Sequence, residues 1–349
     1  MTTTPQPVFD GHNDVLLHLW RAGDAEGQAF FDGRPGGHLD LARCRAGGFA
    51  GGLFAVYVPG RRSRGDTLRP DPDAALPDPV EPGDARRDML EIAATLMRMT
   101  RARGDALRLC RSVGEIEAAR AAGAIAAVMH LEGCEGIGPD LAELEVLHAA
   151  GLRSLGPVWS RSNIFGTGVP FRFPADPDIG PGLTGAGRRL LRRCEELGIL
   201  VDLSHINAAG FRDVAALSSR PLVASHSNLH AIAPSARNLV DWQLDAIRES
   251  GGLVGVNFAV GFLRPDGRAD PDTPLSVMVD HIARLVDRLG EGGVALGSDF
   301  DGAVIPRAIG DAAGLPALLD ALRAAGFGEA LVARIAWGNW IGLLRRVIG

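Results

Sequence analysis

The sequence predicts an α/β fold, specifically a (β/α)8 TIM barrel. Short apolar runs alternate with longer stretches whose apolar residues recur at helical spacing, which is the pattern of successive βα units. Side chains of types that bind metals follow five of these runs, spread along the whole chain. A barrel gathers such residues on one rim, whereas an open doubly wound sheet gathers its ligands at one crevice. Since α/β barrels often reach this length as one unit, we expect a single domain over residues 1–349.

Eight apolar runs predict the strands, at about residues 7–11, 51–58, 124–131, 152–158, 199–204, 221–225, 253–258 and 294–298. The predicted helices are Ala85–Arg103, Leu141–Ala150, Gly185–Leu197, Asp241–Glu249, Pro274–Leu289, Gly314–Ala325 and Glu329–Val347. The expected N-caps are Asp84, Thr184 and Thr273. The expected left-handed C-caps are Gly151, Gly198 and Gly252.

Two long loops interrupt this alternation, and both leave the rim where the metal-binding types of side chain gather. Pro59–Asp84 is rich in Pro, Arg, Asp and Gly, and it fits an ordinary surface excursion as well as a cover for a site. Ser160–Leu183 contains Phe165, Phe171 and Phe173. Its aromatic content makes it the better candidate for the wall of a pocket.

Composition narrows the function. The net charge is −6 and no basic stripe is present, which argues against nucleic acid as a partner. Cys44, Cys110, Cys134 and Cys194 form no CxxC pair, so we expect buried, idle thiols. The N-terminus lacks the pattern of a signal peptide, and no apolar run is long enough to span a membrane. We therefore expect a cytoplasmic protein that does not associate with membranes.

All 36 basic residues other than histidine are arginine, and lysine is absent. A Schiff-base lysine, a phosphate-loop lysine and a carbamylated lysine that bridges two metals are therefore excluded. If two metals are bridged in this protein, a carboxylate bridges them.

The candidate metal ligands stand at the ends of predicted strands. They are His12, Asp14, Glu132, His205, His226 and Asp299. His12 and Asp14 are separated by one residue, so on a strand their side chains share one face. Three histidines and three carboxylates suit two divalent metals that share one carboxylate.

The residues alone leave the individual roles open. Glu132 fits a bridge between the metals, or a rim salt bridge to an arginine. Asp299 fits an acid and base that moves the proton of a metal-bound water, or one more metal ligand. Asp301 competes for that role from a position further out. His130 shares the inward side of its strand with Glu132 but lies deeper, which favours core packing or a supporting hydrogen bond.

Several longer motifs contain these residues. They are Asp10-Gly11-His12-Asn13-Asp14, Leu131-Glu132-Gly133, Asp202-Leu203-Ser204-His205, Ser225-His226-Ser227-Asn228, Arg237-Asn238 and Gly297-Ser298-Asp299-Phe300-Asp301-Gly302. Together they resemble the membrane dipeptidase family, which comprises renal dipeptidase and its bacterial relatives. These are zinc hydrolases with amidohydrolase-like barrels, and the resemblance covers almost the whole chain.

The resemblance implies a role for each residue. His12 and Asp14 would bind one zinc ion, His205 and His226 the other, and Glu132 would bridge them. Asp299 would be the acid and base, and Arg237 would hold the substrate. A guanidinium captures a carboxylate through two hydrogen bonds, although the residues alone favour a surface ion pair for Arg237.

The chain departs from the better-known family members at two positions. Trp159 stands where they carry a histidine at the end of the fourth strand. Ala259 follows Asn257-Phe258 where they carry a tyrosine. Trp159 could donate through its indole N–H or shape the pocket, and Arg161 and Asn163 are polar neighbours that could contact the substrate. The residues of the family's metal centre are therefore better matched in this chain than the residues of its substrate pocket.

We expect a dinuclear zinc dipeptidase that cleaves dipeptides with a free C-terminal carboxylate, including L,D-dipeptides, by means of a hydroxide shared between the metals. One alternative is a metal-dependent amidohydrolase acting on an N-acyl amino acid, a lactone or a cyclic amide. Another is a non-catalytic barrel that binds peptides or small acids. Members of the family often form homodimers, but no interface can be identified from the residues.

Overall fold

A parallel barrel forms the centre of the molecule, as predicted. The computed structural model describes residues 5–60, 71 and 73–349. The strands are β1 Val8–Asn13, β2 Phe49–Tyr57, β3 Leu107–Leu109, β4 Ile125–Glu132, β5 Leu152–Gly156, β6 Leu200–Val201, β7 Val223–Ser227, β8 Leu253–Asn257 and β9 Val294–Gly297. Their order is β6-β5-β4-β2-β1-β9-β8-β7, and β3 pairs with β4 outside this path. The ring closes where Leu203 N donates to Val223 O at 2.8 Å. The (β/α)8 prediction is confirmed.

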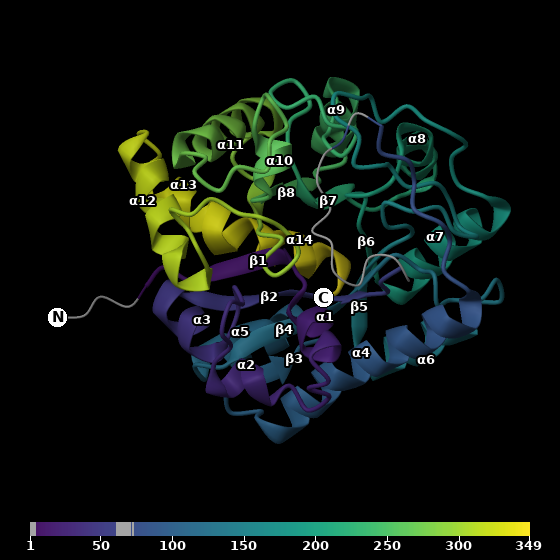
Figure 1. Cartoon of the computed structure of the whole chain (residues 1–349), viewed down its shortest axis with the longest axis horizontal. Helices are drawn as coiled ribbons and strands as arrows, with labels where there is room; N and C mark the ends of the chain where they lie inside the picture. Colours follow the sequence, from purple (N-terminus) through teal and green to yellow (C-terminus); the bar gives the residue numbers. More distant parts are fainter. Residues whose placement is uncertain (1–4, 61–70, 72) are drawn as a thin grey trace.

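Helices surround the strands (Figure 1). The α-helices are α1 Val15–Arg21, α2 Gln28–Asp32, α3 Leu41–Gly47, α4 Pro82–Ala102, α5 Val113–Ala121, α6 Ala142–Ala150, α7 Gly185–Leu197, α8 Ala208–Leu217, α9 Asp241–Glu249, α10 Val260–Leu263, α11 Leu275–Leu289, α12 Leu315–Ala324, α13 Glu329–Ala333 and α14 Asn339–Val347. A 3₁₀ turn, η1 Ala312–Gly314, precedes α12, and a π-helical turn, η2 Arg334–Gly338, joins α13 to α14.

Some boundaries differ from the prediction for identifiable reasons. The predicted N-cap Asp84 is wrong: Glu81 caps α4 by accepting from Asp84 N at 3.0 Å, because Pro82 fits the first helical turn. The N-cap position of α11 is Pro274, without a side-chain capping bond, and not Thr273, whose hydroxyl instead donates to Asp270 O at 2.6 Å. The cap at Thr184 is confirmed. Gly151 and Gly198 have positive φ, but after α9 the residue with positive φ is Gly251 rather than Gly252.

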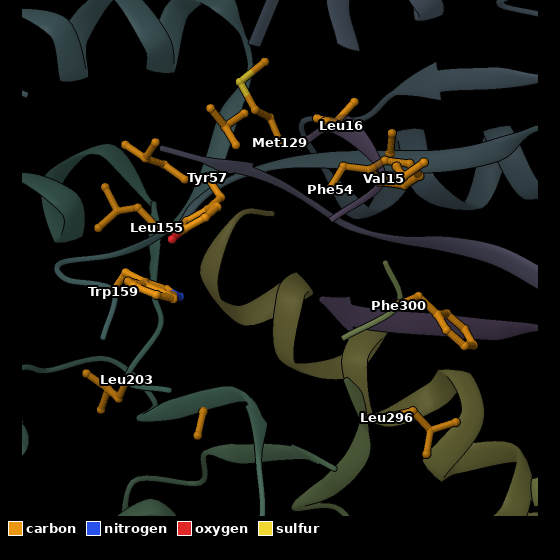
Figure 2. Close-up of a cluster of buried hydrophobic side chains, with 14 of the residues drawn as sticks. Val15, Leu16, Phe54, Tyr57, Met129, Leu155, Trp159, Leu203, Leu296 and Phe300 are labelled. Carbon is orange, nitrogen blue, oxygen red and sulfur yellow. The ribbon is translucent and has the colours of Figure 1, made fainter. Parts of the chain in front are cut away.

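The polar and apolar parts of the barrel are separated along its axis. At the amino-terminal end of the strands, Phe9, Leu53 and Val128 pack in a buried apolar cluster with Trp340 of α14. A larger cluster fills the space between the strands and the outer helices, part of which is drawn in Figure 2. Many buried polar residues, among them Glu132, Ser227 and Asn257, lie instead at the carboxyl ends of the strands, so the fold places its chemistry at that rim.

Of the two predicted long loops, the second reaches the rim as expected and contributes Phe171 to a cavity there. Much of the first loop, residues 61–70 and 72, lies outside the described residues. All four cysteines are free and buried, as predicted. Among the described helices, none combines the length and the apolar character that crossing a membrane requires.

Candidate metal centre

The strand-end residues singled out in the sequence converge on one point at the rim. His12 lies in β1, one residue before its end, and Asp14 follows the strand; Glu132 ends β4, His226 lies in β7, and His205 follows β6. Glu132 Oε1 is 2.9 Å from His205 Nε2, 3.6 Å from His12 Nε2 and 3.7 Å from His226 Nε2. His12 Nε2 is also 3.5 Å from Asp14 Oδ2. One carboxylate oxygen therefore faces three imidazole nitrogens.

Several of these atoms have no hydrogen-bond partner although they are buried. Both ring nitrogens of His12 and Oδ1 of Asp14 are in this state. Buried polar atoms are nearly always paired, so such atoms need an explanation. The ligand atoms of His12, Glu132 and His226 lie within 4.8 Å of one another, as do those of His12, Asp14 and Asp299. These two groups, which share His12, could each hold a cation.

Hydrogen bonds fix the tautomer of His226. Ser225 N and Ser225 Oγ both lie within 2.8 Å of the Asp202 carboxylate, and Ser225 Oγ is 2.7 Å from His226 Nδ1. A carboxylate only accepts, so the Ser225 hydroxyl donates to Asp202 and accepts from Nδ1–H of His226. The lone pair of His226 is therefore on Nε2, which faces Glu132.

His205 is oriented in the same way. Arg237 Nη2 lies 3.0 Å from His205 Nε2, and a guanidinium has no acceptor atom. His205 Nε2 therefore accepts, and its Nδ1–H donates to Ser160 Oγ at 2.8 Å. The Nε2 atoms of His205 and His226 are 3.0 Å apart. Two lone pairs thus face each other beside a carboxylate, an arrangement that suits a cation.

The electrostatics agree with this assignment. Burial, together with the charges of Arg237 and His12, lowers the pKa of His205 and of His226 well below its usual range. Burial also lowers the pKa of His12, but Glu132, Asp14 and Asp299 outweigh it and raise the value to about 10. Burial raises the pKa of Glu132. A divalent cation would stabilise ionised carboxylates and neutral imidazoles here.

Asp299 is held beside Asp14 and differs from Asp301 in its contacts. Asn257 Nδ2 donates to Asp299 Oδ2 at 3.0 Å, and burial raises the pKa of Asp299. A Cβ on Gly302 would meet Asp14 Oδ2 at 2.2 Å and Asp299 Oδ1 at 2.3 Å, so only glycine lets this segment approach both carboxylates. Asp301 instead accepts from Arg34 Nη1 at 2.8 Å.

Arg237 is buried at the centre, not at the surface. It is only 3% exposed. Its Nη1 donates to Ser227 Oγ and its Nη2 to His226 O, each at 3.0 Å, while Nε has no partner. Burial lowers the pKa of Arg237 to about 10, so the guanidinium keeps its charge at neutral pH.

A cavity of about 310 Å³ opens onto these residues. Trp159, Arg237 and Asp299 line it, together with Asp14, Glu132, His205 and His226. Asn163 is not among the lining residues. Its Nδ2 donates to Pro157 O at 2.9 Å and its Oδ1 accepts from Phe165 N at 2.8 Å, so its side chain fastens the loop behind the pocket.

Arg161, the other polar neighbour considered, is also turned away from the cavity. It is fully buried, and its Nε and Nη2 donate to Glu135 Oε1 at 3.1 and 3.0 Å. Its Cζ lies 5.3 Å from the centre of the Trp159 ring. This ion pair supports Trp159 from behind.

Sequence reasoning missed several residues of the site. Tyr57 and Phe262 line the cavity, and Ser160 and Ser225 orient the histidines. Tyr57 is the single tyrosine of the chain and lies one residue before the end of the strand predicted over 51–58, a signal that could have identified it. Ser225 precedes His226 directly, but its contact with Nδ1 depends on Asp202 from the adjacent strand.

The model of the membrane dipeptidase family, peptidase family M19, matches residues 2–348. The chain belongs to this family. The predicted resemblance is confirmed, and with it the assignment to the metallopeptidases.

Two solved structures and one further relative of similar sequence support the assignment to this family. A metallo peptidase from Rhodobacter sphaeroides, liganded with a phosphinate mimic of the dipeptide L-Ala-D-Ala, is 49% identical with a TM-score of 0.95, covering 98% of this chain and 99% of that chain. A dipeptidase described as a metallo peptidase of family M19 is 50% identical, with a TM-score of 0.93 and 99% of each chain covered. An uncharacterized protein in the pqqA 5′ region of Klebsiella pneumoniae is 46% identical over 76% of this chain and 98% of its own length.

Proposed function

We propose that this chain is a dinuclear zinc dipeptidase that acts on dipeptides with a free C-terminal carboxylate, with residues 1–349 serving as one catalytic domain. The observation that carries the proposal is Glu132 Oε1, which faces the Nε2 atoms of His12, His205 and His226 within 3.7 Å. In this assignment His12 and Asp14 would hold one ion, His205 and His226 would hold the other, and Glu132 would serve both.

The donor set suits zinc. Imidazole nitrogens and carboxylate oxygens are its ordinary ligands, whereas Mg²⁺ and Ca²⁺ favour oxygen ligands alone. When bound, two zinc ions supply a nucleophile derived from water at neutral pH and polarise the scissile carbonyl.

The protein's own groups perform the remaining tasks. Asp299, whose pKa burial raises, accepts a proton from the attacking water and delivers it to the leaving amine. Asn257 holds that carboxylate in place through its bond to Oδ2. Arg237 binds the terminal carboxylate through its fixed guanidinium. Trp159 forms part of the pocket wall, and Asn163 supports the loop that carries this wall rather than touching the substrate.

We further propose that the substrates include L,D-dipeptides. The support is the Rhodobacter sphaeroides metallo peptidase, which is liganded with a mimic of L-Ala-D-Ala and shares 49% identity over nearly the whole of both chains.

The test is a hydrolysis panel on the zinc-loaded protein. It comprises L,L- and L,D-dipeptides, the same peptides with an amidated C-terminus, N-acyl amino acids and lactones. We expect cleavage of free dipeptides and a large loss with the amidated peptides, because these lack the carboxylate that Arg237 binds. Activity confined to N-acyl amino acids or lactones would replace the proposal by an amidohydrolase function. Inactivity that zinc does not relieve would indicate a non-catalytic barrel.

A further inference from the structure

Four aromatic rings form a continuous row along one side of the cavity. Tyr57 lies 4.9 Å from Trp159, Trp159 lies 5.4 Å from Phe171, and Phe171 stacks on Phe262 at 5.6 Å, all between ring centres. All four line the cavity. We call this row the aromatic arc. Figure 2 shows its first two members, Tyr57 and Trp159, side by side.

The aromatic arc adjoins the guanidinium and one histidine of the centre. The Cζ of Arg237 lies 6.0 Å from the centre of the Phe262 ring. The His205 ring lies 5.8 Å from Trp159 and 6.4 Å from Phe171. The arc therefore borders the place where a carboxylate bound to Arg237 would lie.

The other side of the cavity has a different chemistry. The segments after β1 and β9 contribute charged and polar side chains, among them His18, Arg21, His38 and Asp301, together with the apolar Leu17 and Val304. Asp14 and Asp299, which follow β1 and β9, also line the cavity. The aromatic side chains of the cavity thus gather beside Arg237, and most of its charged side chains come from the segments after β1 and β9.

Ala259 adds to the apolar character. It lines the cavity next to α10, which carries Phe262. With alanine at this position and tryptophan at 159, none of these five side chains is charged at neutral pH, and the polar atoms among them are the Tyr57 hydroxyl and the Trp159 indole N–H. A charged substituent here would lose its hydration without gaining an ionic partner among these five side chains.

We propose that the aromatic arc binds the side chain of the C-terminal residue and selects an apolar one. This inference rests on the proposed function. In a dipeptide held by Arg237, the Cβ of the C-terminal residue is roughly 2.5 Å from the carboxylate carbon, since both are bonded to one Cα. That side chain therefore falls on the arc. The N-terminal residue lies across the scissile bond, toward the segments after β1 and β9.

The test compares kcat/KM within two matched peptide series on the zinc-loaded enzyme. One series keeps alanine at the N-terminus and places Gly, Leu or Asp at the C-terminus, in whichever stereochemical series is cleaved. The other keeps alanine at the C-terminus and varies the N-terminal residue in the same way. We expect kcat/KM for the peptide with C-terminal Leu to exceed kcat/KM for the peptide with C-terminal Asp by a factor on the order of 10 to 200, the range of discrimination in an apolar pocket.

Variants then assign the preference to the arc. Phe171 is half-buried, so Phe171→Ala removes a ring without opening the barrel core. This variant should lower the ratio of kcat/KM for C-terminal Leu to kcat/KM for C-terminal Gly at least tenfold, and it should leave the corresponding ratio for the N-terminal residue unchanged. Phe171→Leu should restore most of the C-terminal ratio. The matched control is Phe31→Ala, a half-buried phenylalanine of α2 that packs against Arg103 outside the cavity. It should change neither ratio.

The outcomes separate the two proposals. Cleavage of dipeptides without a C-terminal preference, or a Phe171→Ala effect on the N-terminal ratio, overturns the role of the arc and leaves the dipeptidase function standing. Failure to cleave any dipeptide removes the proposed function, and the role of the arc is lost with it.

Discussion

The serine beside His226 has a task that its neutral side chain does not suggest. Ser225 Oγ lies 2.5 Å from Asp202 Oδ2 and 2.7 Å from His226 Nδ1. Because the Ser225 hydroxyl donates to the Asp202 carboxylate, its oxygen is a stronger acceptor for Nδ1–H of His226, the imidazole that faces Glu132. Partners of this kind orient a metal-binding histidine and raise its basicity.

Replacing this serine tests the assignment. We expect Ser225→Ala to weaken zinc binding by about 10- to 100-fold, the usual effect of removing such a partner, measured by competition with a chromogenic chelator. The matched control is Ser154→Ala, which removes a hydroxyl 2.9 Å from His130 Nδ1, deeper in the barrel. Equal zinc affinity in both variants would contradict the role of Ser225.

Asp299 and Asp301 offer a second comparison at the scale of single residues. We expect Asp299→Asn to keep its metal and to lose a factor on the order of 10²–10⁴ in kcat, because an amide cannot exchange the proton. Metal analysis and steady-state kinetics measure the two quantities. Asp301→Asn serves as the control, since its carboxylate pairs with Arg34. Near-normal turnover in Asp299→Asn would remove Asp299 from the mechanism.

Among the elements, α7 shows how local sequence sets a boundary near the site. Thr184 accepts from Gly187 N at 3.1 Å and donates to Ile164 O at 2.6 Å. The same hydroxyl therefore begins α7 and fastens the loop that carries Phe171.

Removing this cap should destabilise the protein measurably. We expect Thr184→Ala to lower the free energy of unfolding by about 1 kcal/mol, and Thr184→Ser to retain most of it, because serine keeps the hydroxyl. Urea denaturation followed by circular dichroism checks both. A Thr184→Ser variant as unstable as Thr184→Ala would show that the methyl group, and not the cap, is responsible.

The elements also show what the sequence could predict. The long periodic segments, such as Gly185–Leu197 and Asp241–Glu249, have the predicted bounds, because one apolar face covers the barrel throughout. β3 was missed, since three residues carry no readable periodicity. The helix predicted over Glu329–Val347 is interrupted by η2, where packing of Trp337 and Trp340 against Phe9 prevails over helical regularity.

The residues of the site also divide into those that the sequence could predict and those that it could not. His12, Asp14 and Glu132 could be found because strand ends are legible in the sequence and the ends of parallel strands meet at one rim. The pocket could be predicted only in part: Trp159 and the loop that carries Phe171 were expected in its wall, and both contribute to it. Phe262, and the burial of Arg161 against Glu135, depend on how loops from distant positions fold over one another, and no spacing in the sequence encodes that.

At the scale of the whole molecule, zinc should contribute to the stability of the fold. A ligand that binds only the native state at a free concentration 1,000 times its Kd adds about 4 kcal/mol. We therefore expect chelation to lower the melting temperature and abolish activity, and zinc to restore both. Mg²⁺ at equal concentration is the control and should restore neither. Unchanged melting after complete removal of metal would contradict this expectation.

We expect zinc to stabilise the junction between β6 and β7 in particular. β6 has two residues, and the backbone of the described chain crosses to β7 through an Asp202–Val223 bridge and the Leu203–Val223 hydrogen bond. The β1–β9 and β5–β6 ladders are also short, whereas β2 and β4 pair along seven residues. We call this β6–β7 junction the seam. His205 follows β6 and His226 lies in β7, so an ion bound by both side chains would hold the two strands together. Amide hydrogens at the seam would then exchange with solvent more slowly in the zinc-loaded protein than in the chelated one, while those of the β2–β4 ladder would serve as the internal reference.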